Sequence, residues 1–345
     1  MTPARRTAIT LTALSVLMLV LAALCLLMGS VDIPAAEVLR IITGHDSDNV
    51  AWNIIVRQSR LPMIATAALA GAALSVAGLL LQTTFNNPLA GPSILGVSAG
   101  AGLGVAIVML ALGGTLGAST TLSVGSYLAT LLGAIIGAGA VLAILIAMSA
   151  IVRSSSMLLI VGILVSYLAS SVISLLNSLA TEEGVHNYVA WGFGSFSGVG
   201  VDQIGLYSVL LLIGLCAAML MVKPLDALLL GTRYAQNLGV DTHHARNALL
   251  LITGLLTAVV TAYCGPIGFI GLVVPHVARF LTATSVHRRL LPATLLAGAD
   301  TALLCAWLSV GGEHGVIPIN AITPIIGVPI IVYIIINRRK IAYFN

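Results

Sequence analysis

Charged residues are scarce in this sequence: only 8% of its 345 residues are Asp, Glu, Lys or Arg, whereas 59% are hydrophobic. A soluble domain carries roughly 25% charged and 45–50% apolar residues, so the composition excludes a water-soluble enzyme. Apolar runs recur from residue 7 to residue 337 with no long polar insert. The sequence therefore predicts an all-α, polytopic membrane protein, with one transmembrane domain over residues 1–345.

Motifs for bond chemistry are also missing. The sequence has no G-x-x-x-x-G-K-[ST] loop for nucleotide phosphates and no nucleophile–base pair, so we expect no catalytic residues and place any ATPase on another chain. Its four cysteines lack the short Cys/His spacing of a metal site, so we expect no metal or other cofactor on this chain. The basic residues lie in short loops without interleaved aromatics, which argues against nucleic-acid binding.

Ten apolar segments are long enough to cross a bilayer, because about 20 residues span a hydrocarbon core of ~30 Å. The first segment is longer than the apolar core of a signal peptide, which has about 7–15 residues, so we expect it to stay uncleaved. A shorter apolar piece at about 186–196 predicts a re-entrant or interfacial segment. The expected spans are 7–29, 60–84, 92–112, 120–150, 155–177, 203–222, 246–264, 267–283, 291–310 and 319–337.

The distribution of Lys and Arg predicts the orientation, since cytoplasmic loops retain these residues. With the N-terminus inside, most of the 15 basic residues fall at cytoplasmic ends, while Arg40, Arg57 and Arg60 lie outside with most of the acids. We therefore expect a multi-pass protein of the inner (cytoplasmic) membrane with both termini in the cytoplasm. Gly96, Gly100 and Gly104 recur every four residues, which predicts a stripe against which another helix packs.

The longest polar stretch between cytoplasmic ends of spans is Lys223–Asn247. Gly231 and Gly239 interrupt it, and glycine commonly ends a short helix. The stretch predicts two small helices along the membrane surface that a soluble partner could grip, with an ordinary connecting loop as the alternative.

Four segments, taken in order, resemble the FecCD-type permeases of ABC importers, which carry iron–siderophore complexes, haem or cobalamin. The resemblance implies a BtuC-like ABC importer permease fold of about ten transmembrane helices per subunit. It also implies a homodimer or a pair of homologous permeases, two cytoplasmic ABC ATPase subunits that hold ATP and Mg, and a periplasmic or lipid-anchored substrate-binding protein. The segments are Arg60–Gly104, Gly231–Val240, Gly265–Phe280 and Pro318–Ile335.

The resemblance assigns coupling roles on the cytoplasmic side. The residues that match the ATPase-coupling helices are Gly231, Ala235, Leu238, Gly239 and Val240. A second cluster, expected to brace the coupling region, consists of Pro275, His276 and Arg279. A haem-ligand role for His276 is the alternative, and a single histidine beside a proline supports it poorly.

The resemblance also places a gate and a pathway. Asn87, Leu89 and Ser155 match residues that narrow the cytoplasmic mouth, although Asn86 and Asn87 could simply cap the turn after the second span. At the outer end of the fifth span we expect Asn177 and Ser178 to line a vestibule, together with the segment that carries Tyr188 and Trp191. Interfacial anchoring of these two aromatic residues is the alternative.

Docking of the binding protein is expected at the outer end of the second span. Arg60 matches the first arginine that the family uses there, whereas Met63 stands at the second position, so Arg57 could substitute from one turn earlier. Some members carry an Asp and an Arg where this chain has Cys305 and Ser309. We therefore expect a cognate binding protein with a different charge layout.

Asp300 lies well inside a span, where a carboxylate is by default a candidate functional residue. It would suit a proton-coupled secondary carrier, which is the alternative class, and an integral-membrane enzyme or cytochrome subunit is a further one. The sequence favours the permease subunit of an ABC importer for a metal chelate. We favour an iron–siderophore complex over cobalamin or haem only because that group is the broadest.

Overall fold

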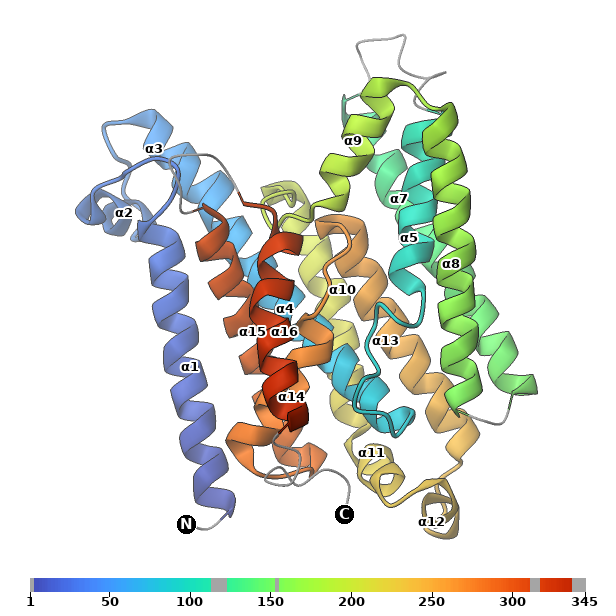
Figure 1. The fold of residues 1–345 in the computed structure, drawn as a ribbon. Coiled ribbons are helices and arrows are strands. Elements are labelled where there is room, and N and C mark those ends of the chain that lie inside the picture. Colours follow the sequence, from blue (N-terminus) through green and yellow to red (C-terminus); the bar gives the residue numbers. More distant parts are fainter. Residues whose placement is uncertain (1–2, 113–122, 153–154, 311–316, 337–345) are drawn as a thin grey trace. The chain divides into compact units, whose positions relative to one another are not determined.

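The computed structural model describes residues 3–112, 123–152, 155–310 and 317–336, and within these ranges all regular elements are helices (Figure 1). The chain forms two compact units, each built from separate stretches. The first unit comprises Met1–Val76, Ser195–Ile213 and Phe269–Asn345, and the second comprises Ala77–Gly194 and Gly214–Gly268. The chain passes from one unit to the other within helices α4 and α10, and also between Gly194 and Ser195 and between Gly268 and Phe269.

The first unit holds the N-terminal and C-terminal helices. Arg6, near the start of α1, contacts the end of α14. Its Nε donates to the carbonyl of Leu281 at 2.8 Å, and its Nη2 donates to that of Phe280 at 2.9 Å. Glycines allow close packing elsewhere, since a Cβ on Gly71 would meet the carbonyl oxygen of Gly298. Its elements are α1 (Pro3–Leu27), α2 (Ala35–Ile42), α3 (Val50–Ile54), η1 (Ile55–Arg60), the start of α4 (Leu61–Thr84), the start of α10 (Val201–Leu220), α14 (Ile270–Thr282), α15 (His287–Val310) and α16 (Ile319–Ile336).

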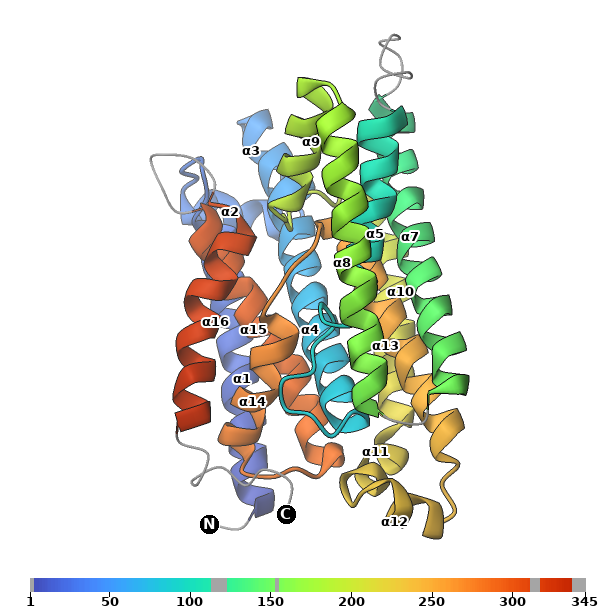
Figure 2. The ribbon, with the colours of Figure 1, turned by 45° about the vertical axis from the view of Figure 1, so that its right-hand side comes forward.

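The second unit holds the central helices. In both views α9 lies at one end of this unit and α11 and α12 lie at the other (Figure 2). Its elements are the end of α4, α5 (Val97–Ala106), η2 (Ile107–Leu112), α7 (Ser123–Ile151), α8 (Ser155–Leu179), α9 (Glu182–Gly192), the end of α10, α11 (Val222–Leu229), α12 (Thr232–Asn237) and α13 (Thr242–Cys264).

Each of the ten expected spans corresponds to an apolar helix in the described residues. Seven helices are long and apolar enough to cross a membrane, and three are shorter: Val97–Ala111, Ile270–Thr282 and Ile319–Tyr333. The first short one measures about 22 Å at 1.5 Å per residue, less than a bilayer core. The expected piece at 186–196 overlaps α9, whose 11 residues are likewise too few to cross.

The glycine stripe of α5 packs against α7. A Cβ on Gly104 would meet the carbonyl oxygen of Gly133, and one on Gly100 would meet that of Gly137 at 2.6 Å. Two helix backbones can approach this closely only where the facing residues are glycine or another small residue. Gly96 differs from the expectation, because it is the residue before α5, has φ +80°, and faces Gly162 of α8 instead.

This contact gives a first testable prediction. Gly104→Ala should lower the free energy of unfolding by about 1–3 kcal/mol, because the added methyl group forces two backbones apart. Gly139→Ala is the matched control on α7, since a Cβ there would meet nothing within 4 Å. It should leave stability unchanged or raise it slightly. Unfolding of the purified variants in detergent measures both, and equal stability of the two would contradict the close packing.

Candidate functional site

The stretch expected to contact a soluble partner folds as two short helices, α11 and α12. We call residues 222–241 the coupling segment. Gly231 lies between the two helices with φ 97° and ψ 154°, a conformation open only to glycine. Its carbonyl accepts a hydrogen bond from the Ala235 N–H at 3.0 Å, which starts α12. Gly231 therefore sets the angle at which α12 leaves α11.

A Schellman motif ends α12. Gly239 has φ +83°, its N–H donates to the carbonyl of Gln236 at 2.9 Å, and the N–H of Val240 donates to the carbonyl of Ala235 at 3.0 Å. These are the two bonds that define the motif, which usually needs glycine at the left-handed position. Ala235 is fully buried. Three of the five expected coupling residues thus fix how the helix ends.

Three large apolar side chains of the coupling segment are exposed. Leu238 is 64% exposed, and Tyr234 and Leu230 are 67% and 60% exposed. Sequence reasoning identified Leu238 but missed Tyr234 and Leu230, although large apolar residues inside an otherwise polar loop were the available signal. Such residues in contact with water are typical of a surface that a partner covers.

Asp241 connects the coupling segment to α13. Its Oδ1 accepts the N–H groups of His243 and His244, each at 3.0 Å, and its Oδ2 lies 2.7 Å from Nδ1 of His244. These contacts satisfy N–H groups that the first helical turn leaves unpaired. The hydrogen bonds from His244, backbone first, lower the pKa of Asp241 below its ordinary value. Gln236 of α12 also donates to the hydroxyl of Thr242 at 3.1 Å.

The lowered pKa predicts how this helix start responds to acid. Because the folded-state pKa is depressed, the stabilisation is complete above the ordinary aspartate pKa of about 3.9 and is lost as the pH falls through the lower folded value. Hydrogen exchange at residues 242–246 should therefore speed up on acidification beyond the intrinsic pH effect. In Asp241→Asn, which keeps an acceptor but cannot titrate, that extra increase should vanish. An identical pH profile in both proteins would contradict the assignment.

The expected gate begins with another Schellman motif at the end of α4. Asn86 has φ +46°; its N–H donates to the carbonyl of Thr83 at 3.2 Å, and the N–H of Asn87 donates to that of Gln82 at 3.1 Å. The Asn87 side chain then accepts the N–H of Leu89 at 3.0 Å. The turn-capping alternative is therefore observed for both asparagines.

The gating role of Asn87, Leu89 and Ser155 stays a prediction. Leu89 is 45% exposed at the tip of this turn, so its side chain is available to narrow an opening. Ser155 begins α8, and its side chain lies outside the described residues.

The other end of α8 carries a polar stripe. At 1.5 Å per residue, Asn177 lies about 33 Å along the helix from Ser155. The Asn177 Oδ1 is buried with no hydrogen-bond donor among the described residues, and Ser178 donates to the carbonyl of Leu175 at 2.7 Å. Ser170, Ser174 and Ser178 recur every four residues and are exposed. Polar residues at intramembrane positions usually face a protein interior or a water-filled path.

Tyr188 and Trp191 belong to α9, at the same end of the second unit. Their rings stack with centroids 6.1 Å apart. Both side chains are half-buried, and a Cβ on Gly102 of α5 would lie 3.5 Å from the Tyr188 hydroxyl. This burial raises the pKa of Tyr188. The two aromatic residues therefore pack α9 against α5. This packing is compatible both with a vestibule lining and with interfacial anchoring.

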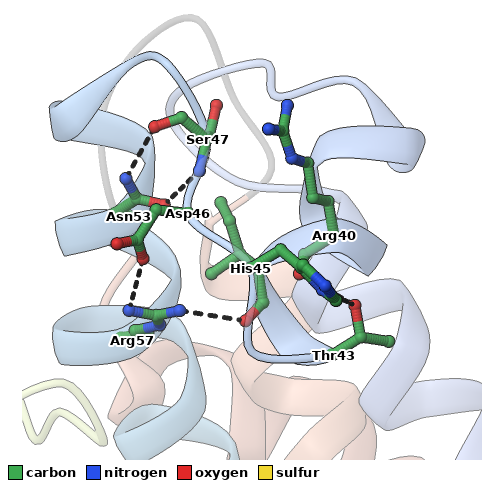
Figure 3. A network of polar contacts seen from close by, with 8 residues as sticks. Arg40, Thr43, His45, Asp46, Ser47, Asn53 and Arg57 are labelled. Carbon is green, nitrogen blue, oxygen red and sulfur yellow. Dashed lines mark hydrogen bonds and ion pairs between the residues drawn. The ribbon is translucent and has the colours of Figure 1, made fainter.

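The two arginines expected to dock a binding protein differ in their surroundings. Arg60 is 5% exposed. Its guanidinium donates to the backbone carbonyls of Leu26 and Leu27 at the end of α1, and to that of Val31 in the loop that follows. Arg57 is exposed; it pairs with Asp46 at 2.8 Å and donates to the carbonyl of Ile41 at 3.4 Å (Figure 3). Arg57 is thus the arginine that a partner could reach.

Arg57 lies on a folded cap. Residues 31–60 enclose a small apolar cluster, and Asn53 and Ser47 exchange two hydrogen bonds, at 3.0 and 2.9 Å, that close the loop between α2 and α3 (Figure 3). The buried members of the cluster are Ile33, Val38, Ile41 and Val56. The cap therefore presents Arg57 from a structured surface.

The other positions singled out in the sequence are buried in the first unit. Met63, Cys305 and Ser309 lie in the interior, and the Ser309 hydroxyl donates to the carbonyl of Ile317 at 2.5 Å. Asp300 is 5% exposed, and neither carboxylate oxygen has a hydrogen-bond donor among the described residues. No group of three or more His, Cys, Asp or Glu in that part of the chain could hold a metal ion.

The Pro275, His276 and Arg279 cluster lies in α14. His276 and Arg279 are 3% and 4% exposed, so both side chains are enclosed by protein. Pro275 is within the helix. The bracing role of the cluster stays a prediction.

The chain is similar to known proteins over nearly its whole length. The FecCD transport family matches residues 17–337. Vitamin B12 import system permease proteins of Klebsiella pneumoniae and Citrobacter koseri are each 33% identical, covering 94% and 97% of this chain and 93% and 96% of their own. A solved structure described as an inward-facing metal-chelate type ABC transporter is 28% identical, has a TM-score of 0.82, and covers 94% of this chain and 98% of its own.

The family accounts for the missing catalytic motifs, since its members are transport subunits that work with a separate ATPase and a substrate-binding protein. The apolar helices that make up the described ranges of the chain agree with it. The chain therefore belongs to the FecCD transport family and is a membrane permease subunit of an ABC importer.

Proposed function

We propose that this permease imports a large metal chelate, and that the coupling segment receives the work of ATP hydrolysis. The whole-length family match carries the proposal. The coupling segment supports it, since it presents Leu230, Tyr234 and Leu238 to a partner on helices whose ends are fixed by Gly231 and Gly239. ATP and Mg are bound by the partner ATPase, and this chain binds no cofactor.

The identity of the chelate has three candidates. The relatives named as vitamin B12 permeases favour cobalamin, at an identity of 33%. An iron–siderophore complex is the expectation from the sequence, and haem is the third member of the class. Uptake of each labelled chelate by a strain that lacks the gene, with and without the gene restored, tests the proposal. Uptake of none of the three in the restored strain would contradict it.

The pathway is proposed to run along α8 between two copies of the chain. Tyr167 and Leu168 of this helix are 70% and 66% exposed, and its polar stripe includes Asn177 and Ser178. A stripe of this kind is poorly matched to lipid but suits a water-filled route between two subunits. Asn87, Leu89 and Ser155 close the cytoplasmic mouth, and Asn177 and Ser178 line the outer vestibule. The functional unit is then a homodimer.

The basic residues support a proposed orientation in the membrane. Arg6 lies against the end of α14, and Arg288 and Arg289 begin α15, so these three arginines share one end of the first unit. The positive-inside rule places that end in the cytoplasm. We therefore propose an inner-membrane protein with a cytoplasmic N-terminus and C-terminus, with the cap and Arg57 facing outward to meet the binding protein.

A further inference from the structure

Two residues near the start of α13 hold the last turn of α7. Nη2 of Arg246 donates to the carbonyl of Ser149 at 2.5 Å, and the Ser149 hydroxyl donates to Oδ1 of Asn247 at 2.8 Å. Ser149 is 1% exposed. The last carbonyls of a helix lack partners within the helix, and a cation there is favourable. We call Ser149, Arg246 and Asn247 the α7–α13 clamp.

The clamp lies directly behind the coupling segment. Only residues 238–241 separate α12 from α13. The Schellman motif at Gly239, the hydrogen bond from Gln236 to Thr242 and the Asp241 cap fix this connection. A displacement of α12 is therefore passed to the start of α13, whose fifth residue is Arg246.

From α7 the contact continues to α5. The backbones of Gly100 and Gly104 lie against those of Gly137 and Gly133, with the side chains of Val141 and Val108 packed beside them. Closely packed backbones move together, because they have little room to slide or deform. A displacement of the α7 end is thus passed to α5.

The segment before α5 is the expected gate, since residues 85–96 carry Asn87 and Leu89. Coupling segment, clamp and gate all belong to the second compact unit. The hydrogen bond between Ser98 of α5 and Thr261 of α13, at 3.3 Å, is a second link, about 22 Å along α13 from Arg246. α13 and α7 also pack directly, since a Cβ on Gly254 of α13 would meet the Leu142 side chain of α7. Without the clamp, the end of α13 that follows α12 could tilt away from the end of α7 about this packed middle.

We propose that Arg246 is a positioning residue whose clamp on Ser149 transmits movement of the coupling segment to the gate. The inference rests on the proposed function, because it assumes that an ATPase moves α12. Loss of the clamp then uncouples hydrolysis from transport: the ATPase still docks and turns over, but less chelate crosses for each ATP.

The test uses the full complex of this chain with its ATPase and binding protein in proteoliposomes, measuring ATP hydrolysis and chelate uptake together. Arg246→Met removes the donor and keeps the length of the side chain. We expect hydrolysis to stay within about twofold of wild type while uptake per ATP falls at least about fivefold, the lower end of measured coupling effects. Arg246→Lys, which retains a donor, should recover part of the loss. Arg288→Met is the control for charge, since Arg288 is an exposed residue of α15.

The outcomes separate the clamp from the function on which it rests. Unchanged uptake per ATP in Arg246→Met would overturn the clamp, and so would a proportional fall in hydrolysis and uptake, which indicates only lost stability or assembly. If Arg246→Met does not reach the membrane, Asn247→Ala decides by the same ratio, because it removes only the serine contact. A wild-type complex without ATP-dependent uptake would instead refute the proposed function itself.

Discussion

Gly239→Trp should abolish ATP-driven uptake while the chain still accumulates in the membrane. A Cβ at Gly239 would meet nothing within 4 Å, so the new side chain begins in open space. It would project from the surface that includes Leu238 and that we assign to the ATPase. A non-glycine residue at φ +83° also costs roughly 1–2 kcal/mol, which weakens the end of α12. Both effects act on the docking surface.

Two matched variants separate these effects. Gly239→Asn tests the backbone alone, because asparagine is small and tolerates the left-handed region, and it should retain most uptake. Gly44→Trp places the same side chain at another open glycine with φ +94°, in the cap between α2 and α3. Co-purification of the ATPase should be lost in Gly239→Trp and retained in Gly44→Trp. Undiminished uptake in Gly239→Trp would remove the coupling assignment.

Arg60→Met should destabilise the chain far more than Arg57→Met. The Arg60 guanidinium is buried against three carbonyls at the end of α1 and in the loop after it, and its removal leaves them without this donor. Hydrogen bonds to a charged group contribute roughly 1.5–3 kcal/mol, so we expect a loss of at least about 2 kcal/mol. Arg57 makes an exposed ion pair with Asp46, and such pairs contribute roughly 0–1 kcal/mol.

Unfolding of the purified variants in detergent measures this difference, and equal stability of the two would contradict the placement of Arg60. The result also decides how docking is tested. Charge reversal at Arg60 would disturb the fold, so it cannot report on a surface contact. Arg57→Glu alone should weaken binding of the cognate binding protein, while unfolding stays close to that of wild type.

The sequence predicted the helices well because long apolar runs and glycines in turns are strong local signals. Apolar runs set the positions of the ten helices, and the glycines at 231 and 239 marked where α11 and α12 end. Arg60 showed the limit of this reasoning. Its family position suggested a surface contact, but the carbonyls that enclose it come from residues 29 to 34 positions earlier in the chain.

Long-range contacts also explain what the sequence could not show at Arg246. The partner of this arginine lies 97 residues away on α7, and no periodicity in α13 indicates it. Asn86 and Asn87 illustrate the opposite case, because turn chemistry is local and the capping alternative could be read directly from the sequence. Residue types thus predicted helices and turns, while the tertiary packing determined which polar side chains remain exposed.

One measurement tests most directly whether transport by this permease depends on a separate ATPase. The purified permease is reconstituted in liposomes with its ATPase and binding protein, and accumulation of labelled cobalamin, ferric siderophore and haem is followed. We predict accumulation of one chelate only when ATP and the ATPase are both present, with no accumulation from a proton gradient alone. Accumulation by the permease alone, driven by an ion gradient, would contradict the account.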